Sequence, residues 1–181
     1  MRTRARAGFS LVELMIVVGI LAVLAAFALP SFRSSNAMRV DEATRLVRDA
    51  METARLRSVA VNRPLQVRFN CPATGQFRVV EAGWPESGRC STTSYPYPAP
   101  PDAAYRTPPK PRFDGPLRMV DRRVTLSGSD PSLALQFNPD GRAYRVVSGS
   151  AQVISSVAVT VTSDGYTKSV TVNSLGKVRT Q

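Results

Sequence analysis

The chain has 181 residues, 43% of them hydrophobic, which suffices for one domain with its own core and one further apolar segment. Its formal net charge of +11 favours an acidic partner, such as nucleic acid, anionic lipid or an acidic protein. Histidine, the usual general base and the commonest metal ligand, is absent, and neither Gly-x-Ser-x-Gly nor Gly-x-x-x-x-Gly-Lys occurs. The composition therefore predicts no enzyme, no cofactor, no metal site and no small-molecule substrate.

The amino-terminal stretch is first basic and then apolar. Arg2, Arg4 and Arg6 precede about twenty apolar residues, which is enough for a helix to cross a bilayer with the arginines on the cytoplasmic side. Glu13 lies inside this run, where an ionisable side chain costs about 2.5 to 3.5 kcal/mol and usually has a function. One alternative is a glutamate that reaches back to headgroup water. Another is a secretory signal cleaved near residues 26–28, although such a signal needs no glutamate.

Helical spacing continues beyond Pro30. Apolar or small side chains recur every three to four residues, at Val40, Ala43, Val47, Ala50, Ala54, Ser58 and Val61. We expect one helix of about 80 Å from Phe9 to Val61, with residues 9–31 in the membrane and residues 32–63 amphipathic. Pro30 lacks a donor for the preceding turn and predicts a kink or local melting. Asn62 and Pro64 predict the end of the helix.

The amphipathic half is also rich in charge. The spacing of helical ion pairs occurs three times: Asp41 and Arg45 are four residues apart, and Glu42 and Arg45, like Glu52 and Arg55, are three apart. The charged side is expected to face solvent, while the apolar side packs on a sheet.

After Pro64 the pattern changes to alternation typical of strands, and turn signals at residues 138–141 and 163–165 separate several of the runs. One long helix against an antiparallel sheet makes residues 64–181 a β-rich head and the whole chain an α+β protein. The predicted strands are LQVRF from Leu65, QFRVV from Gln76, RRVTL from Arg122, LALQF from Leu133, AYRVV from Ala143, SVAVTVT from Ser156 and KSVTV from Lys168.

Cys71 and Cys90 are the only cysteines. In a domain carried across the membrane, such a pair favours a disulfide, which would contribute on the order of 3 kcal/mol for a loop of this length. Free thiols are the alternative, and two sulfurs without histidine make a poor zinc site.

Residues 95–116 hold eight of the fourteen prolines. Such a segment should be extended and cannot join a central strand. We interpret it as a surface insertion between strands, with a partner-contact role for Tyr95, Tyr97 and Tyr105 as the alternative.

The stretch GFSLVELMIVVGILAVLAAFALP resembles the prepilin motif shared by type IV pilins and type II secretion pseudopilins. The resemblance implies that prepilin peptidase removes residues 1–8 by cleavage between Gly8 and Phe9, and that the new amino group of Phe9 is methylated. In a filament, Glu13 of one subunit would then meet the Phe9 ammonium of its neighbour, which fixes the axial register. Glu13 and Pro30 are the assembly residues of this motif.

Later segments narrow the resemblance. ARLRSVAVNRPLQVRFN, LQFNPDGRA and SVTVNSLGKVRTQ are similar to the GspH/FimT group of minor pilins and pseudopilins. This implies a subunit that helps to initiate or tip a type IV pilus or a type II secretion pseudopilus, with other minor and major pilins or pseudopilins as partners. It also implies a single-pass inner-membrane precursor with a periplasmic head.

Some members of this group bind DNA for natural transformation through a carboxy-terminal Gly-Arg-x-Arg motif. Here Lys177 replaces the first arginine and Arg179 keeps the second, so the charge is retained while one bidentate fork is lost. Arg142, Arg145 and Lys168 are candidates to extend a patch that contacts phosphates. These basic residues either form the DNA-binding surface of a DNA receptor or are scattered over the surface without a common function.

Overall fold

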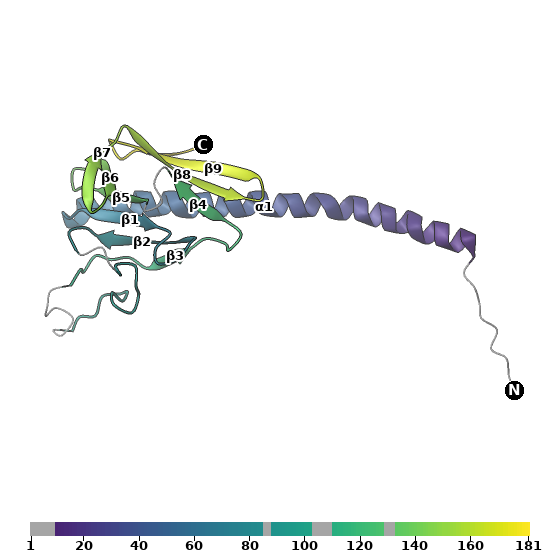
Figure 1. Ribbon diagram of the computed structural model, residues 1–181, viewed down its shortest axis with the longest axis horizontal. Helices are drawn as coiled ribbons and strands as arrows, with labels where there is room; N and C mark the ends of the chain where they lie inside the picture. The colour runs from purple at the N-terminus through teal and green to yellow at the C-terminus, as the bar shows by residue number, and fades with distance from the viewer. Residues whose placement is uncertain (1–9, 85–87, 103–109, 129–132) are drawn as a thin grey trace.

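A computed structural model describes residues 10–84, 88–102, 110–128 and 133–181, without the side chains of residues 25–34. One helix, α1 (Leu11–Val61), projects from a head made of strands and packs its second half against them (Figure 1). The strands are β1 (Leu65–Phe69), β2 (Gln76–Glu81), β3 (Leu117–Met119), β4 (Thr125–Gly128), β5 (Ala134–Phe137), β6 (Ala143–Val147), β7 (Ser150–Val153), β8 (Ser156–Ser163), β9 (Tyr166–Asn173) and β10 (Val178–Thr180).

The strands form two sheets in which all pairs are antiparallel. The six-stranded sheet has the order β3-β2-β1-β5-β6-β7, and the four-stranded sheet has the order β10-β9-β8-β4. In the first sheet Val67 of β1 lies between Val79 of β2 and Leu135 of β5. The α+β class predicted from the sequence is confirmed, with two sheets in place of the single one expected.

The helix has clear ends and no interruption. Ser10 has an extended backbone before the first turn, and Asn62 ends the helix in the left-handed conformation with its N–H directed to the carbonyls of Ser58 and Val59. The predicted end at Asn62 is therefore confirmed. The helix continues across Pro30, so the local melting expected there is not found.

The second half of α1 supplies one side of the core. The predicted stripe is buried from Val40 (1% exposed) through Val47 and Ala54 (both 0%), and only Val61 at its end is half-buried. Ser58 is the polar member of the stripe, and its hydroxyl donates to carbonyl oxygens of Arg55 and Asn138. The opposing side chains come from both sheets: Leu65, Val67, Phe69, Phe77, Leu135, Phe137, Val159, Val161, Val170 and Val172.

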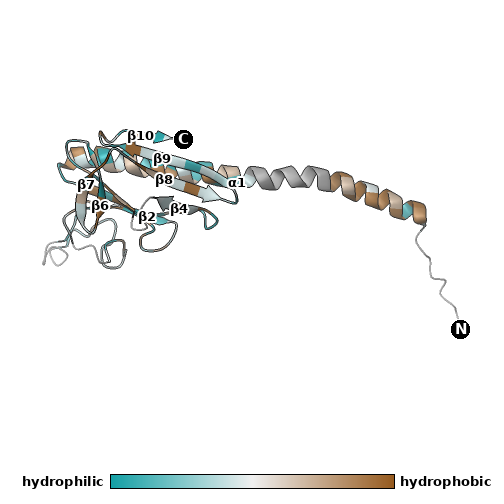
Figure 2. Ribbon diagram, turned by 45° about the horizontal axis from the view of Figure 1, so that its top comes forward, coloured by the Kyte–Doolittle hydropathy of each residue, from teal (hydrophilic) through white to brown (hydrophobic). Residues whose placement is uncertain are grey.

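The amino-terminal part of α1 is apolar and extends away from the head (Figure 2). Within the described residues, no helical stretch combines the length and the hydropathy needed to cross a membrane. The predicted span covers residues 9–31, of which residue 9 and the side chains of residues 25–31 lie outside the described part.

A long connection, residues 82–116, leads from β2 to β3, and its described parts contain no strand, as the prolines predict. Tyr105 lies outside the described residues, and Tyr97 is 50% exposed. Near the start of the connection Cys90 forms a disulfide with Cys71, with a Cα–Cα distance of 5.6 Å, so the predicted bridge is confirmed. The bridge holds the connection against the loop that follows β1.

Candidate functional site

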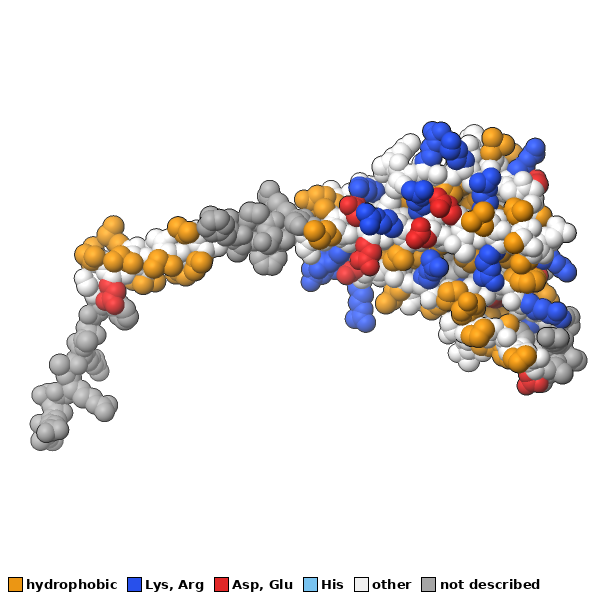
Figure 3. Space-filling view, turned by 180° about the vertical axis from the view of Figure 1, so that it is seen from behind, with side chains coloured by type: hydrophobic (Ala, Val, Ile, Leu, Met, Phe, Trp, Pro, Cys, Tyr) orange, Lys and Arg blue, Asp and Glu red, His pale blue; other side chains and the backbone are white. Residues whose placement is uncertain are grey.

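The first candidate surface is the projecting helix. Every large apolar side chain from Leu11 to Leu24 is exposed, with fractions between 44% at Val17 and 74% at Leu11. Because successive helical residues turn by about 100°, the consecutive apolar residues 14–18 cover every side of the helix. A helix that is apolar all round is normally buried in a protein or a membrane. This stretch therefore needs a cover from outside its own chain. Figure 3 shows one face of it, on which hydrophobic side chains predominate.

Glu13 lies in the first turn of this exposed stretch. The free N–H groups of a first helical turn carry partial positive charge, which favours an acidic side chain there. Gly8 and Phe9, the predicted processing residues, lie outside the described part, as does the side chain of Pro30. The pairing of Glu13 with a neighbour's Phe9 ammonium stays a prediction.

Two of the five basic residues proposed for DNA lie on neighbouring turns. Arg142 follows the turn between β5 and β6, and Lys177 follows the turn between β9 and β10. The turns meet because Gly176 packs against the carbonyl oxygen of Gly141, so closely that an added Cβ would overlap it. Arg55 of α1 joins them, with Nε donating to the same carbonyl at 3.1 Å. Three cations thus lie together at this end of the helix.

The other candidates do not join this group. Lys168 of β9 forms an ion pair with Asp41 of α1 at 2.5 Å. Arg145 of β6 donates to Gln152 of β7 at 3.2 Å. In β10, Val178 and Thr180 line hollows with helix residues, so Arg179 between them faces the opposite side of the sheet.

The helical ion pairs also differ from those predicted. Asp41 pairs with Lys168, Arg55 bonds to a backbone carbonyl, and Glu52 pairs with Arg48 at 2.8 Å. This last hydrogen bond raises the pKa of Arg48 above its ordinary value.

A buried ion pair in the long connection was missed by sequence reasoning. Arg89 and Asp114, with side chains 1% and 3% exposed, form two hydrogen bonds of 2.7 Å. Arg89 also donates to the carbonyl of Glu81, and Asp114 accepts the N–H of Glu81 at 2.9 Å. The guanidinium lies 4.5 Å from the ring centroid of Tyr95. These contacts fix both ends of the connection to the end of β2.

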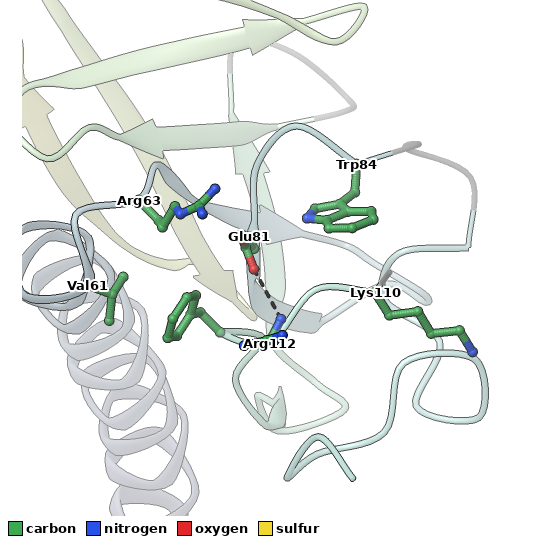
Figure 4. A pocket seen from close by; sticks show the side chains of 7 residues that line it. Val61, Arg63, Glu81, Trp84, Lys110 and Arg112 are labelled. Carbon is green, nitrogen blue, oxygen red and sulfur yellow. Dashed lines mark hydrogen bonds between the residues drawn. The ribbon is translucent and has the colours of Figure 1, made fainter. Parts of the chain in front are cut away.

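Next to this pair lies a cleft of about 450 Å³ that sequence reasoning also missed. Its lining comes from the end of α1, the end of β2 and the long connection: Val61, Arg63, Glu81, Trp84, Lys110, Arg112 and Phe113. Glu81 is 8% exposed, and its Oε2 accepts the backbone N–H of Arg112 at 3.1 Å (Figure 4). These residues come from separate segments, so no spacing in the sequence links them. The single tryptophan was the one available signal.

Comparisons with known proteins found one matching family model and two similar solved structures. Residues 3–29 match a family model described as the prokaryotic N-terminal methylation motif. No curated protein matches the chain. Two crystal structures of the type IV minor pilin FimU of Pseudomonas aeruginosa strain PAO1, in space groups P65 and P21, are similar, with TM-scores of 0.49 and 0.48 and 12% sequence identity. The similarity covers 78% and 83% of this chain and 91% of each FimU chain.

Proposed function

We propose that this chain is a minor pilin or pseudopilin, which is cleaved between Gly8 and Phe9, methylated at Phe9 and incorporated into a filament through α1. The observation that carries the proposal is the exposed apolar helix around Glu13, which coincides with the methylation motif. The role is structural, and prepilin peptidase and other pilins or pseudopilins are the partners.

The physical reasoning begins with the two environments that can cover an apolar helix, which are lipid and other helices. Removing each large apolar side chain from water contributes about 1.5 to 3 kcal/mol in either environment. Moving the helix from lipid into a bundle of helices therefore gains little hydrophobic free energy. Specific assembly needs another interaction. A carboxylate in hydrocarbon is costly when alone and tolerable when paired. The ammonium created by cleavage supplies that partner and sets the register between subunits.

The disulfide supports a head in an oxidising compartment such as the periplasm, with the precursor anchored in the inner membrane. The similarity of the later sequence to the GspH/FimT group supports a place at the start or the tip of the filament. A type IV pilus and a type II secretion pseudopilus use the same helix physics, so both are included in the proposal.

The test replaces Glu13 by alanine or glutamine in the full-length protein. We expect membrane insertion and peptidase cleavage to persist while incorporation into sheared filaments is lost, because both changes remove the charge. Glu42→Ala is the matched control, since Glu42 is an exposed acid on the second half of α1. Normal incorporation of Glu13→Gln would refute the assembly role of the carboxylate.

A second candidate function, a DNA receptor for natural transformation, is favoured by the meeting of Arg55, Arg142 and Lys177 on neighbouring elements. The full-length protein in detergent should then retard DNA, with an affinity that falls steeply with salt. Combined Arg142→Ala and Lys177→Ala should reduce both the affinity and the salt slope, whereas Lys168→Ala should not, because Lys168 lines a different hollow from Arg55 and Lys177. Retardation that does not depend on salt, or no retardation, would exclude this function.

A further inference from the structure

The cleft beside β2 combines an indole, a nearly buried carboxylate and cationic side chains. We propose that it binds an acidic sugar unit, such as a uronate, of an anionic polysaccharide. This binding is independent of the filament role, because the lining residues lie at the opposite end of α1 from Leu11 (Figure 1).

The cationic side chains at the edge of the cleft favour a negatively charged ligand. Arg63 and Arg112 are both exposed, and within the described part of the chain neither side chain has an acidic partner. Lys110 adds a third cation to the lining. Guanidinium groups bind carboxylates through paired N–H donors, so two unpaired arginines at one cleft favour a carboxylate-bearing ligand.

The aromatic and apolar side chains that form the walls of the cleft favour a flat ligand with one apolar face. Trp84 is half-buried and forms one side of the cleft, and Val61 lies on the far side (Figure 4). Phe113 also lines the cleft. The face of an indole carries partial negative charge and attracts the weakly positive C–H groups of a neighbouring ring. One face of a pyranose ring presents such C–H groups, while hydroxyls surround its edge.

Glu81, the buried carboxylate of the cleft, favours a ligand with hydroxyl groups that can donate hydrogen bonds to it. Glu81 uses Oε2 to accept the N–H of Arg112, and an ionised carboxylate has about four acceptor positions in total. The remaining capacity suits sugar hydroxyls, which donate in any direction around the ring. The lining offers one indole, whereas proteins that bind single-stranded nucleic acids stack successive bases on several aromatic side chains. An acidic sugar therefore fits better than a nucleic acid.

The protein carries its own reporter, because Trp84 is the only tryptophan. The full-length protein in neutral detergent micelles would be titrated with tetragalacturonate while tryptophan fluorescence is recorded. We expect a saturable change, and an affinity for neutral cellotetraose at least about 10-fold lower, because a charge-assisted hydrogen bond contributes roughly that factor. Arg63→Ala and Arg112→Ala should each weaken tetragalacturonate binding by about 10-fold.

Arg122→Ala is the control, since Arg122 is an exposed cation that does not line the cleft, and this variant should bind like the unaltered protein. Trp84→Phe tests the aromatic wall separately. Its binding of tetragalacturonate would be measured by calorimetry and should also be weaker. A thermal melt of each variant identifies any loss of folding. The proposal is overturned by no saturable change, by equal affinity for cellotetraose, or by oligothymidylate binding that is tighter than tetragalacturonate binding and is weakened by Arg63→Ala, which would assign the cleft to nucleic acid.

Discussion

Loss of Arg89 should destabilise the head far more than loss of any exposed arginine. Its guanidinium makes two 2.7 Å hydrogen bonds to Asp114 and a third, of 3.0 Å, to the carbonyl of Glu81, with 1% of the side chain exposed. Arg89→Ala leaves the Asp114 carboxylate buried, with the N–H of Glu81 as its one remaining partner among the described residues.

The size of the effect follows from burial. Removing one member of a buried ion pair costs about 3 to 5 kcal/mol, because the other charge stays desolvated. In a domain of this size each kcal/mol lowers the melting temperature by a few degrees, so we expect a loss of about 10 °C. Arg142→Ala is the matched control, because its side chain is 63% exposed and lies 3.8 Å from Asp140. An exposed pair of this kind contributes about 0 to 1 kcal/mol.

The assay is thermal unfolding of the full-length protein in detergent, followed by the fluorescence of Trp84. A second variant separates the charge from the packing. Arg89→Met combined with Asp114→Leu removes both charges and should recover much of the lost stability, because apolar replacements of buried ion pairs are often neutral. Equal melting temperatures for Arg89→Ala and Arg142→Ala would refute the reasoning, as would a double variant less stable than Arg89→Ala.

Two further predictions concern backbone constraints in the head. Cys71→Ser with Cys90→Ser should lower the free energy of unfolding by about 3 kcal/mol, since the bridge closes a loop of 19 residues, and reductant should reproduce the loss in the unaltered protein. Gly176→Ala should cost more than Gly165→Ala in the same melt. Both glycines have positive φ, but an added Cβ overlaps the carbonyl of Gly141 only at Gly176, so equal costs would contradict the close approach.

Periodicity in the sequence predicted the long elements well. The three-to-four spacing on α1 gave the buried stripe, and β1 and β6 have the predicted bounds. The strands β3, β7 and β10 were missed, because each has three or four residues and takes its place from the register of a neighbouring strand. Their own sequences are too short to alternate.

Charge pairing was less predictable. Helical spacing suggested Arg45 as the partner of Asp41, but the fold brings Lys168 closer from a strand more than a hundred residues away. Arg89 and Asp114 lie 25 residues apart in a proline-rich region, and nothing in their spacing indicates a buried pair. Such contacts depend on tertiary approach, which local patterns do not encode.

Two surfaces proposed here, the assembly helix and the cleft, are separable by their positions. Val61 lines the cleft and Leu11 begins the exposed apolar stretch, and these two residues are the ends of the 51-residue helix α1, about 75 Å apart. Helices packed around Leu11 therefore leave the cleft open to a ligand. Glu13→Ala should abolish incorporation without changing tetragalacturonate binding, and Arg63→Ala should weaken tetragalacturonate binding about 10-fold without changing incorporation. If either change affected both properties, the two surfaces would not act independently.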